Sequence, residues 1–400
     1  MIAAAVGAIL LAAITLYATL GGADFGGGLW DLLAGGDRRG RAPRALIDES
    51  ITPVWEANHV WLIFALVIFW TGFPDAFAAV MTAAALPIWL AVLGIVLRGA
   101  GFAFRKEVSR LSLQRALGAV FAFSSLLTPF FMGTVIGGIA AAQIPGDASH
   151  ARLSAWTSPT SLLIGALFVG ACGYLAAVYL IGEAARRGDR RLEAYFTRRA
   201  QVSGVVTGAL SLAALLVLHG SDAALLHRLT GRALPLVIVA GLAGLAVLAL
   251  LTAGRPRGIR VLAALGVAAV VWGWGVAQYP SLLPGTAVTL SNAGAPHATL
   301  AALVVLFALV ALLVGPSFLL LFALHGRQVL GMGDEMLLAT GPAGGTWLPS
   351  GLVGGGRLPP GAPGRAGGSS RPPGAGSRAA ALGLVAAGVL VRLLARRRDR

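Results

Sequence analysis

The chain has 400 residues, of which 57% are hydrophobic and only 12% are charged, and its formal net charge is +15. Soluble domains carry about a quarter charged residues, so this composition excludes an ordinary soluble protein. A bilayer core about 30 Å thick needs about 20 apolar residues per helix. Several stretches meet that length, and their apolar runs are continuous rather than alternating, which excludes an outer-membrane barrel. We therefore predict an all-α, polytopic membrane protein.

Nine apolar segments follow one another along the chain and predict about nine transmembrane helices. The first resembles a secretory signal peptide in length, but such a peptide begins with basic residues, and the first basic residue here is Arg38. Between the second and third segments, Gly72-Phe73-Pro74-Asp75 predicts a tight turn, with Asp75 as its cap. The segments are residues 2–22, 57–72, 76–98, 115–142, 158–182, 200–219, 233–253, 259–279 and 298–323.

Basic residues concentrate in alternate loops. The odd-numbered loops and their flanks hold the runs 38–44, 98–115, 186–199 and 255–260, whereas the even-numbered loops hold only Arg152, Arg228 and Arg232. Because Lys and Arg gather in cytoplasmic loops, the odd loops are expected in the cytoplasm and the N-terminus outside. The positive charge is then expected to face anionic membrane lipids, not nucleic acid.

The C-terminal part differs in composition from the spans. We predict a transmembrane helical domain over residues 1–330 and a flexible, Gly/Pro/Arg-rich cytoplasmic tail over 331–379. Residues 380–400 form a short apolar-basic segment interrupted by Arg392. About 17 residues is the lower limit for spanning a bilayer, which favours an interfacial helix over a marginal extra span.

Two carboxylates stand at expected span ends, where ionisable groups are costly and by default mark function. Asp24 lies in GGADFGGGLWDLL at the end of the first segment, and Glu56 lies in PVWEANHVWLI at the start of the second. One cytoplasmic loop joins these ends, so the two carboxylates are expected to lie close together. They are either a proton-input pair, because a partly buried carboxyl group can exchange protons near neutral pH, or helix-end groups bonded to backbone, Arg44 or Arg98.

The remaining polar and aromatic features have structural explanations. The glycine-rich stretch lacks the Lys of a phosphate-binding loop and follows no strand, so its glycines are expected to pack helices closely. His59 could ligate haem, but a hydrogen bond to a neighbouring helix is the simpler expectation. Cys172 is expected to be a packing residue. An aromatic belt near the membrane surfaces would explain Trp55, Trp61, Trp70, Trp272, Trp274 and Tyr279.

Four motifs, in chain order, resemble those of subunit II of cytochrome bd-type quinol oxidases. They are GGADFGGGLWDLL, SITPVWEANHVWLI, LRGAGFAFR and WGWGVAQYPSLLPG, and the resemblance covers about residues 1–330. The most specific are Trp-acid-x-Asn-x-Val-Trp and Arg-x-x-Gly-Phe, which flank the second and third spans. The motif residues of this sequence are Trp55, Asn58, His59, Trp61, Arg98, Gly101, Phe102, Arg105, Trp274, Tyr279, Pro280 and Pro284.

The resemblance implies one subunit of a heterodimeric oxidoreductase in the bacterial cytoplasmic membrane, which oxidises quinol and reduces dioxygen to water. A haem-bearing subunit I would carry haems b and d. This chain would ligate no haem or metal, would stabilise its partner without being catalytic alone, and can hold a quinone between its helices. The family fold implies two four-helix bundles plus a peripheral helix.

The resemblance further implies that Glu56 and Asp24 belong to a cytoplasmic proton pathway. Asp24 matches the second acid of the family's Asp-Gly-Phe-Asp motif, whereas Gly21 replaces the first acid and Ala23 the usual aromatic residue. The alternative function is a multi-spanning secondary transporter. Transporters bind substrate near the bilayer midplane on broken helices, whereas the carboxylates here are expected at span ends.

Overall fold

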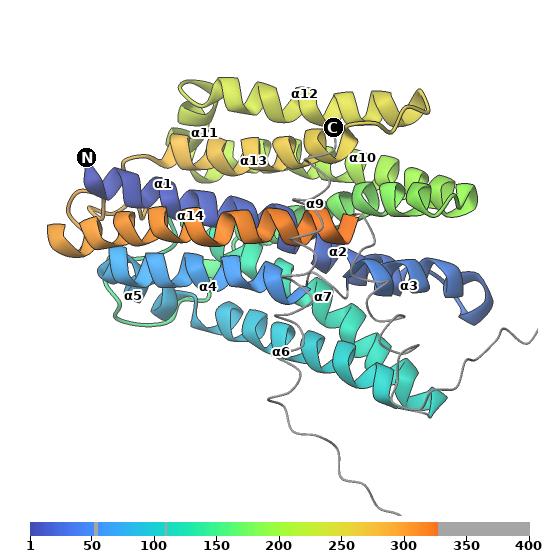
Figure 1. The fold of residues 1–400 in the computed structure, drawn as a ribbon. Helices are drawn as coiled ribbons and strands as arrows, with labels where there is room; N and C mark the ends of the chain where they lie inside the picture. Colours follow the sequence, from blue (N-terminus) through green and yellow to red (C-terminus); the bar gives the residue numbers. More distant parts are fainter. Residues whose placement is uncertain (52–54, 109, 327–400) are drawn as a thin grey trace, which may run out of the picture. The chain divides into compact units, whose positions relative to one another are not determined.

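The computed structural model describes residues 1–51, 55–108 and 110–326, and the regular elements in these residues are helices (Figure 1). The expected tail 331–379 and the final segment 380–400 lie outside the described residues. The helices are α1 (Ile2–Leu16), η1 (Tyr17–Gly21), α2 (Gly22–Leu32), α3 (Asp37–Ile51), α4 (Trp55–Gly72), α5 (Pro74–Ala83), α6 (Ala85–Glu107), α7 (Leu111–Ala140), α8 (Ser154–Thr157), α9 (Pro159–Arg186), α10 (Arg190–Ser221), α11 (Ala223–Thr230), α12 (Leu234–Thr252), α13 (Ile259–Gln278) and α14 (His297–Gly326).

The number of helices that can cross a membrane agrees with the prediction. Within the described residues, 8 helices are long and apolar enough to cross a bilayer, and the pair α4 and α5 makes a ninth if it counts as one span. This pair is bent by 118° at Phe73. The all-α, polytopic class is therefore confirmed, because a bilayer selects for long apolar runs that sequence alone reveals.

The first span extends further than expected. α1, η1 and α2 together run from Ile2 to Leu32, so the prediction that the span ends near residue 22 was wrong. Glycine weakens an isolated helix by about 1 kcal/mol, but here the glycines allow close helix packing. A Cβ atom at Gly26 would lie 1.9 Å from the carbonyl oxygen of Cys172, and one at Gly28 would lie 2.2 Å from Cβ of Ser125.

The predicted third span, residues 76–98, is also wrong as a single segment. Phe73 is non-helical, as a residue before proline tends to be, and Pro74 occupies the first turn of the short helix α5. Ala84, with φ −106° and ψ 28°, then interrupts the helix, and α6 begins at Ala85. The expected turn is thus present, but it leads into α5, where the exposed Asp75 lies in the first turn instead of capping a turn.

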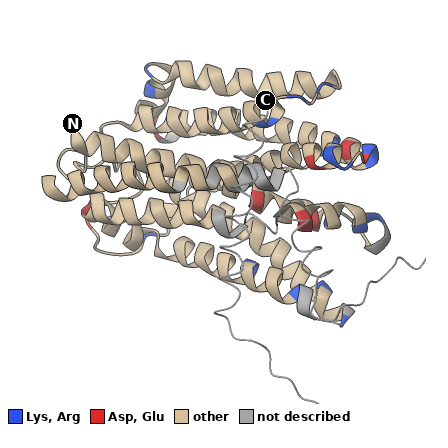
Figure 2. Ribbon diagram, in the orientation of Figure 1, with Lys and Arg blue, Asp and Glu red and all other residues tan. Residues whose placement is uncertain are grey.

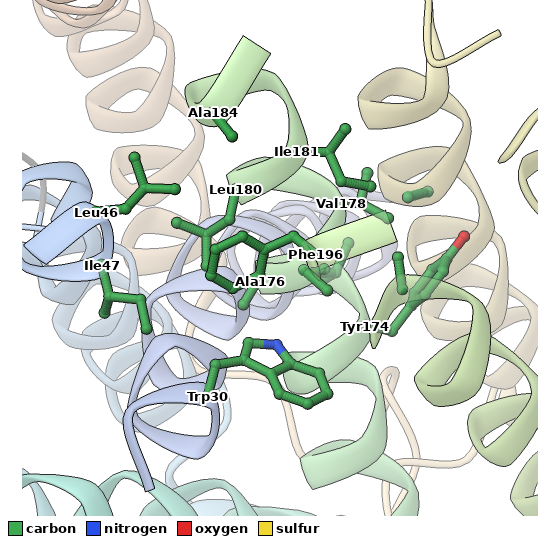
Figure 3. Packing of buried hydrophobic residues seen from close by; sticks show 14 of the residues in the cluster. Trp30, Leu46, Ile47, Tyr174, Ala176, Val178, Leu180, Ile181, Ala184 and Phe196 are labelled. Atoms are coloured by element: carbon green, nitrogen blue, oxygen red, sulfur yellow. The ribbon is translucent and has the colours of Figure 1, made fainter. Parts of the chain in front are cut away.

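Helix α9 is central to the packing, since it contacts α2, α7 and α10. Figure 3 shows Trp30 of α2, Leu46 and Ile47 of α3 and Phe196 of α10 gathered around side chains of α9. Small residues let α7 and α9 approach each other, as is common between membrane helices. A Cβ atom at Gly133 would lie 2.8 Å from Cα of Gly165.

The basic residues lie at the helix ends, in keeping with their loop pattern. Figure 2 shows Lys and Arg residues grouped on α3, around the start of α10 and at the end of α6, which belong to the odd-numbered loops and their flanks. The first loop contains a helix, α3, despite Pro43 within it. That the N-terminus is outside stays a prediction.

Candidate functional site

Asp24 and Arg98 form a buried ion pair between α2 and α6. Arg98 Nη2 donates to Asp24 Oδ1 at 2.6 Å, and the side chains of Arg98 and Asp24 are 2% and 1% exposed. Arg98 Nε donates to Ser125 Oγ of α7 at 3.0 Å. The guanidinium carbon lies 5.0 Å from the ring centroid of Phe25 and 5.1 Å from that of Phe121. The alternative in which Asp24 bonds Arg98 is thus confirmed as a contact.

The surroundings of Arg98 correct two sequence-based expectations. Arg98 was counted with the basic residues of a cytoplasmic loop, but it lies inside a membrane-spanning helix with almost no exposed surface. Asp24 was expected at a helix end, but its helix continues to Leu32. A charge can be buried here because a partner of opposite charge and several hydrogen bonds replace its lost hydration.

Asp24 retains one unused acceptor. Its second carboxylate oxygen, Oδ2, is buried and has no hydrogen-bond partner among the described residues. An ionised carboxylate accepts several hydrogen bonds through its two oxygens. The carboxylate of Asp24 is therefore held by Arg98 on one side and available on the other.

A second set of ion pairs lies one step closer to the helix ends. Asp31 Oδ2 accepts from Arg105 Nη1 at 2.9 Å, and Asp31 Oδ1 accepts from Arg44 Nε at 2.8 Å. Arg105 also pairs with Asp48 of α3, and its guanidinium carbon lies 4.8 Å from the ring centroid of Phe121. Asp31, in contrast to Asp24, has both carboxylate oxygens bonded.

Sequence reasoning did not assign a role to Asp31, although a signal was present. The aspartates of α2 and the arginines of α6 have the same spacing along their helices, from Asp24 to Asp31 and from Arg98 to Arg105. This spacing is close to two helical turns. Two matched pairs of opposite charge on two spans therefore predict two contacts between the same helices.

The other residues of the Arg-x-x-Gly-Phe motif pack α6 on α7. A Cβ atom at Gly101 would lie 2.9 Å from the carbonyl oxygen of Leu117 and 3.0 Å from the backbone nitrogen of Phe121. The ring centroids of Phe102 and Phe121 are 5.7 Å apart. Gly101 and Phe102 thus bring α7 close enough for Phe121 to contact both arginines.

The start of α4 lies beside η1. Asn58 Nδ2 donates to the carbonyl oxygen of Leu20 at 3.3 Å. The side chains of Trp55 and Glu56 lie outside the described residues, so the predicted proximity of Glu56 to Asp24 is not tested. The placement of Asn58 brings the beginning of α4 next to the turn that precedes Asp24.

His59 and Trp61 belong to an aromatic group around the first span. The ring centroid of His59 lies 6.2 Å from that of Tyr17 and 5.9 Å from that of Phe25. Trp61 packs against the buried cluster of Tyr17, Phe25 and Cys172. Cys172 is buried there as a free thiol, as expected of a packing residue.

The fourth motif shapes the connection between α13 and α14. Arg232 donates to the carbonyl oxygen of Ala277 at 2.6 Å and to that of Tyr279. The Tyr279–Pro280 peptide bond is cis, and the backbone nitrogen of Leu290 donates to the carbonyl oxygen of Pro280 at 3.0 Å. Trp274 is half-buried against two apolar clusters, and Pro284 is buried within the folded loop. Trp274 and Pro284 therefore serve packing, whereas the side chains of Tyr279 and Pro280 are exposed.

These observations define a polytopic helical membrane protein in which a buried carboxylate–guanidinium pair joins two spans. Among the described residues there is no group of three or more His, Cys, Asp or Glu that could hold a metal ion. A family model for cytochrome bd terminal oxidase subunit II matches residues 2–325. The chain therefore belongs to this family.

Individual relatives agree with the family match. The chain is 30% identical over 149 residues to cytochrome bd ubiquinol oxidase subunit 2 of Bacillus subtilis, covering 36% of this chain and 43% of the relative. It is 25% identical over 214 residues to cytochrome bd-I ubiquinol oxidase subunit 2 of Escherichia coli K12, covering 52% and 54%. The chain spans about half the length of the curated relatives it matches.

A solved structure shows the same fold. The structure of bd oxidase from Geobacillus thermodenitrificans matches with a TM-score of 0.65 and 20% identity, covering 81% of this chain and 98% of that chain. The family resemblance is thus confirmed, and the chain is a multi-pass protein of the cytoplasmic membrane. The transporter alternative finds no support in these matches.

Proposed function

We propose that this chain is the non-haem subunit of a membrane quinol oxidase and works only with a haem-bearing partner that carries haems b and d. The family match and the printed names of the relatives, which are ubiquinol oxidase subunits, support this assignment. Quinol oxidised in the complex supplies electrons, and reduction of dioxygen to water consumes as many protons as electrons. Supplying those protons from the cytoplasm is the task assigned to this chain, besides stabilising its partner.

The observation that carries the proton role is the buried carboxylate of Asp24 with its unused Oδ2. A carboxylate in a membrane span is costly and by default functional, and the Arg98 guanidinium stabilises it there. Because Oδ2 has no hydrogen-bond partner among the described residues, it is the oxygen to which the proposal assigns proton uptake. The role of Glu56 rests on the family resemblance, supported by the position of α4 beside η1.

Oxygen consumption by the purified complex tests this function. Glu56→Ala should slow quinol-dependent oxygen consumption while the haem absorbance stays close to that of the unchanged complex. Removal of an acid–base group costs about 10²-fold or more where no other group replaces it. Asp75→Asn is the matched control, because Asp75 is exposed in α5, a helix apart from the ion pairs.

Two outcomes would contradict the proposal in different ways. Unchanged turnover in both Glu56→Ala and Asp24→Asn would remove the proton role. Loss of haem absorbance in these variants would instead assign the two residues to assembly of the complex.

A further inference from the structure

Tyr17 places a hydroxyl group inside the first span. The residue is 6% exposed, and its hydroxyl, like Asp24 Oδ2, is a buried polar atom without a hydrogen-bond partner among the described residues. Inside a bilayer each such group costs several kcal/mol unless it is satisfied. Each of these two atoms on the first span therefore calls for a partner.

The Tyr17 ring lies over Gly21, in the part of the span that leads to Asp24. A Cβ atom at Gly21 would lie 2.9 Å from ring atom Cε2 of Tyr17 and 3.6 Å from Cζ. The ring centroid is 6.2 Å from that of Phe25, two turns further along. The hydroxyl is attached to Cζ, so it lies close to Gly21, three residues before Asp24. The groups that act electrostatically on this hydroxyl are Arg98, Asp24 and Cys172.

Gly21 makes this arrangement possible. A Cβ atom at this position would lie too close to the Tyr17 ring, so the ring would have to move. The π-helical turn η1, from Tyr17 to Gly21, lies directly before α2, and such turns frequently mark functional sites. The family resemblance expects a further acid at position 21. In this chain the Tyr17 ring fills the space that a side chain at Gly21 would need.

The polar side chains around Tyr17 are those of His59, Trp61, Arg98 and Cys172. The rings of His59 and Phe25 flank Tyr17. Arg98 is already bonded to Asp24 and Ser125. Cys172 Sγ would lie 3.5 Å from a Cβ atom at Gly22, and a thiol is only a weak hydrogen-bond donor. A small polar molecule between the two orphaned oxygens is the simplest way to satisfy both.

We propose that Tyr17 and Asp24 hold an internal water molecule between them. This water donates one hydrogen bond to Asp24 Oδ2, and a second hydrogen bond joins it to the Tyr17 hydroxyl. Buried waters typically make about three hydrogen bonds to such groups and are costly to remove. Tyr17 is then a positioning residue, which keeps a proton-carrying molecule against Asp24. The water site depends on the geometry alone, whereas its use in catalysis rests on the proposed proton role.

A high-resolution structure of the complete oxidase tests the water site directly. We expect density for an ordered water between Tyr17 Oη and Asp24 Oδ2, and loss of that density in Tyr17→Phe. Tyr174→Phe is the matched control, because Tyr174 also buries an unpartnered hydroxyl, in α9, and none of the described charged groups acts on it. A direct Tyr17–Asp24 hydrogen bond, or water retained in Tyr17→Phe, would overturn the proposal.

The effect on turnover tests the use of the water. Tyr17→Phe should lower oxygen consumption by about threefold to tenfold, less than the loss of an acid–base group, with a changed pH profile, while Tyr174→Phe leaves both unchanged. The double variant Tyr17→Phe/Asp24→Asn should be no slower than Asp24→Asn. Independent, multiplying effects would show that Tyr17 does not act through Asp24.

Gly21→Ala provides a second test if Tyr17→Phe fails to assemble. It keeps the hydroxyl but pushes the ring away, so the water should again be lost. If Asp24→Asn leaves turnover unchanged while the water is present in the density, the proton role of Asp24 fails and the water site stands. If the density lacks the water while Asp24→Asn slows turnover, the water site fails and the proton role stands.

Discussion

The ion pair between Asp24 and Arg98 gives a quantitative prediction about stability. Asp24→Asn keeps the shape of the side chain but removes its charge, which leaves the 2% exposed guanidinium of Arg98 buried without a counter-charge. Two unit charges about 4 Å apart attract by about 4 kcal/mol at an effective dielectric constant of about 20. Removal of one partner of a buried pair costs about 3–5 kcal/mol. We therefore expect Asp24→Asn to destabilise the complex by about 3–5 kcal/mol.

A double-mutant cycle separates charge from packing. Arg98→Met removes the guanidinium and retains a long apolar side chain, and the double variant Asp24→Asn/Arg98→Met leaves no unpaired charge. The double variant should be more stable than either single variant, because both charges are gone. Denaturation of the purified complex in mixed micelles, followed by haem absorbance, provides the free energies of unfolding.

The size of the coupling decides between two descriptions of the contact. Neutral hydrogen bonds between membrane helices couple by only about 0.6 kcal/mol on average. A coupling of several kcal/mol would identify an ion pair that connects α2 and α6. A coupling below about 1 kcal/mol would refute the reasoning, since it lies in the range of a neutral hydrogen bond.

Two further predictions follow from close packing and from partial exposure. Gly26→Ala should reduce the yield of assembled complex, because the new Cβ atom would lie 1.9 Å from the carbonyl oxygen of Cys172, whereas the control Gly208→Ala meets no atom within 4 Å and should be neutral or stabilising by up to about 1 kcal/mol. Equal yields of the two variants would contradict close α2–α9 packing. Arg105→Gln should cost less than Asp24→Asn and should cost less at high salt than at low salt, because Arg105 pairs both with the buried Asp31, which is 6% exposed, and with Asp48, which is 34% exposed, and the exposed pair is screened. Denaturation at low and high salt measures this, and a cost that does not depend on salt would count against it.

The sequence predicts the spans better than it predicts their ends. Long apolar runs are required by the bilayer, so α7, α9, α12, α13 and α14 agree with the expected segments. Helix α10 begins at Arg190, earlier than the expected start at residue 200, because its basic first turns were counted as loop. The ends of the first and third spans were misplaced where packing overrides local preference. Gly26 and Gly28 stay helical because α9 and α7 come close, and no window along the chain contains that information.

The charges of the site were harder to predict than the fold. Arg98 reads as a loop residue because a basic residue at the end of an apolar run is normally solvated. Its partner, Asp24, lies 74 residues away in the sequence. Tyr17 was overlooked because a tyrosine in an apolar segment is usual, and only the structure shows that its ring lies over Gly21 with its hydroxyl buried and without a hydrogen-bond partner among the described residues.

The carboxylates on this side of the protein form an ordered series from surface to interior. The exposed fraction of the side chain falls from 34% at Asp48 to 6% at Asp31 and 1% at Asp24. Arg105 joins the first two, and Phe121 contacts both Arg105 and Arg98. Paired guanidinium groups therefore let carboxylates extend inward along α2 without an unpaired charge.

The bonding of the carboxylates differs along this series. Both oxygens of Asp31 accept from arginines, whereas Asp24 Oδ1 accepts from Arg98 and Oδ2 has no hydrogen-bond partner among the described residues. Protonation of either aspartate would neutralise its carboxylate, and at Asp24 it would take the counter-charge from the buried Arg98 guanidinium. Under the proposed proton role, Oδ2 is therefore the oxygen that takes up the proton, because Oδ1 is bonded to Arg98, and the loss of the counter-charge is the cost that this uptake has to meet.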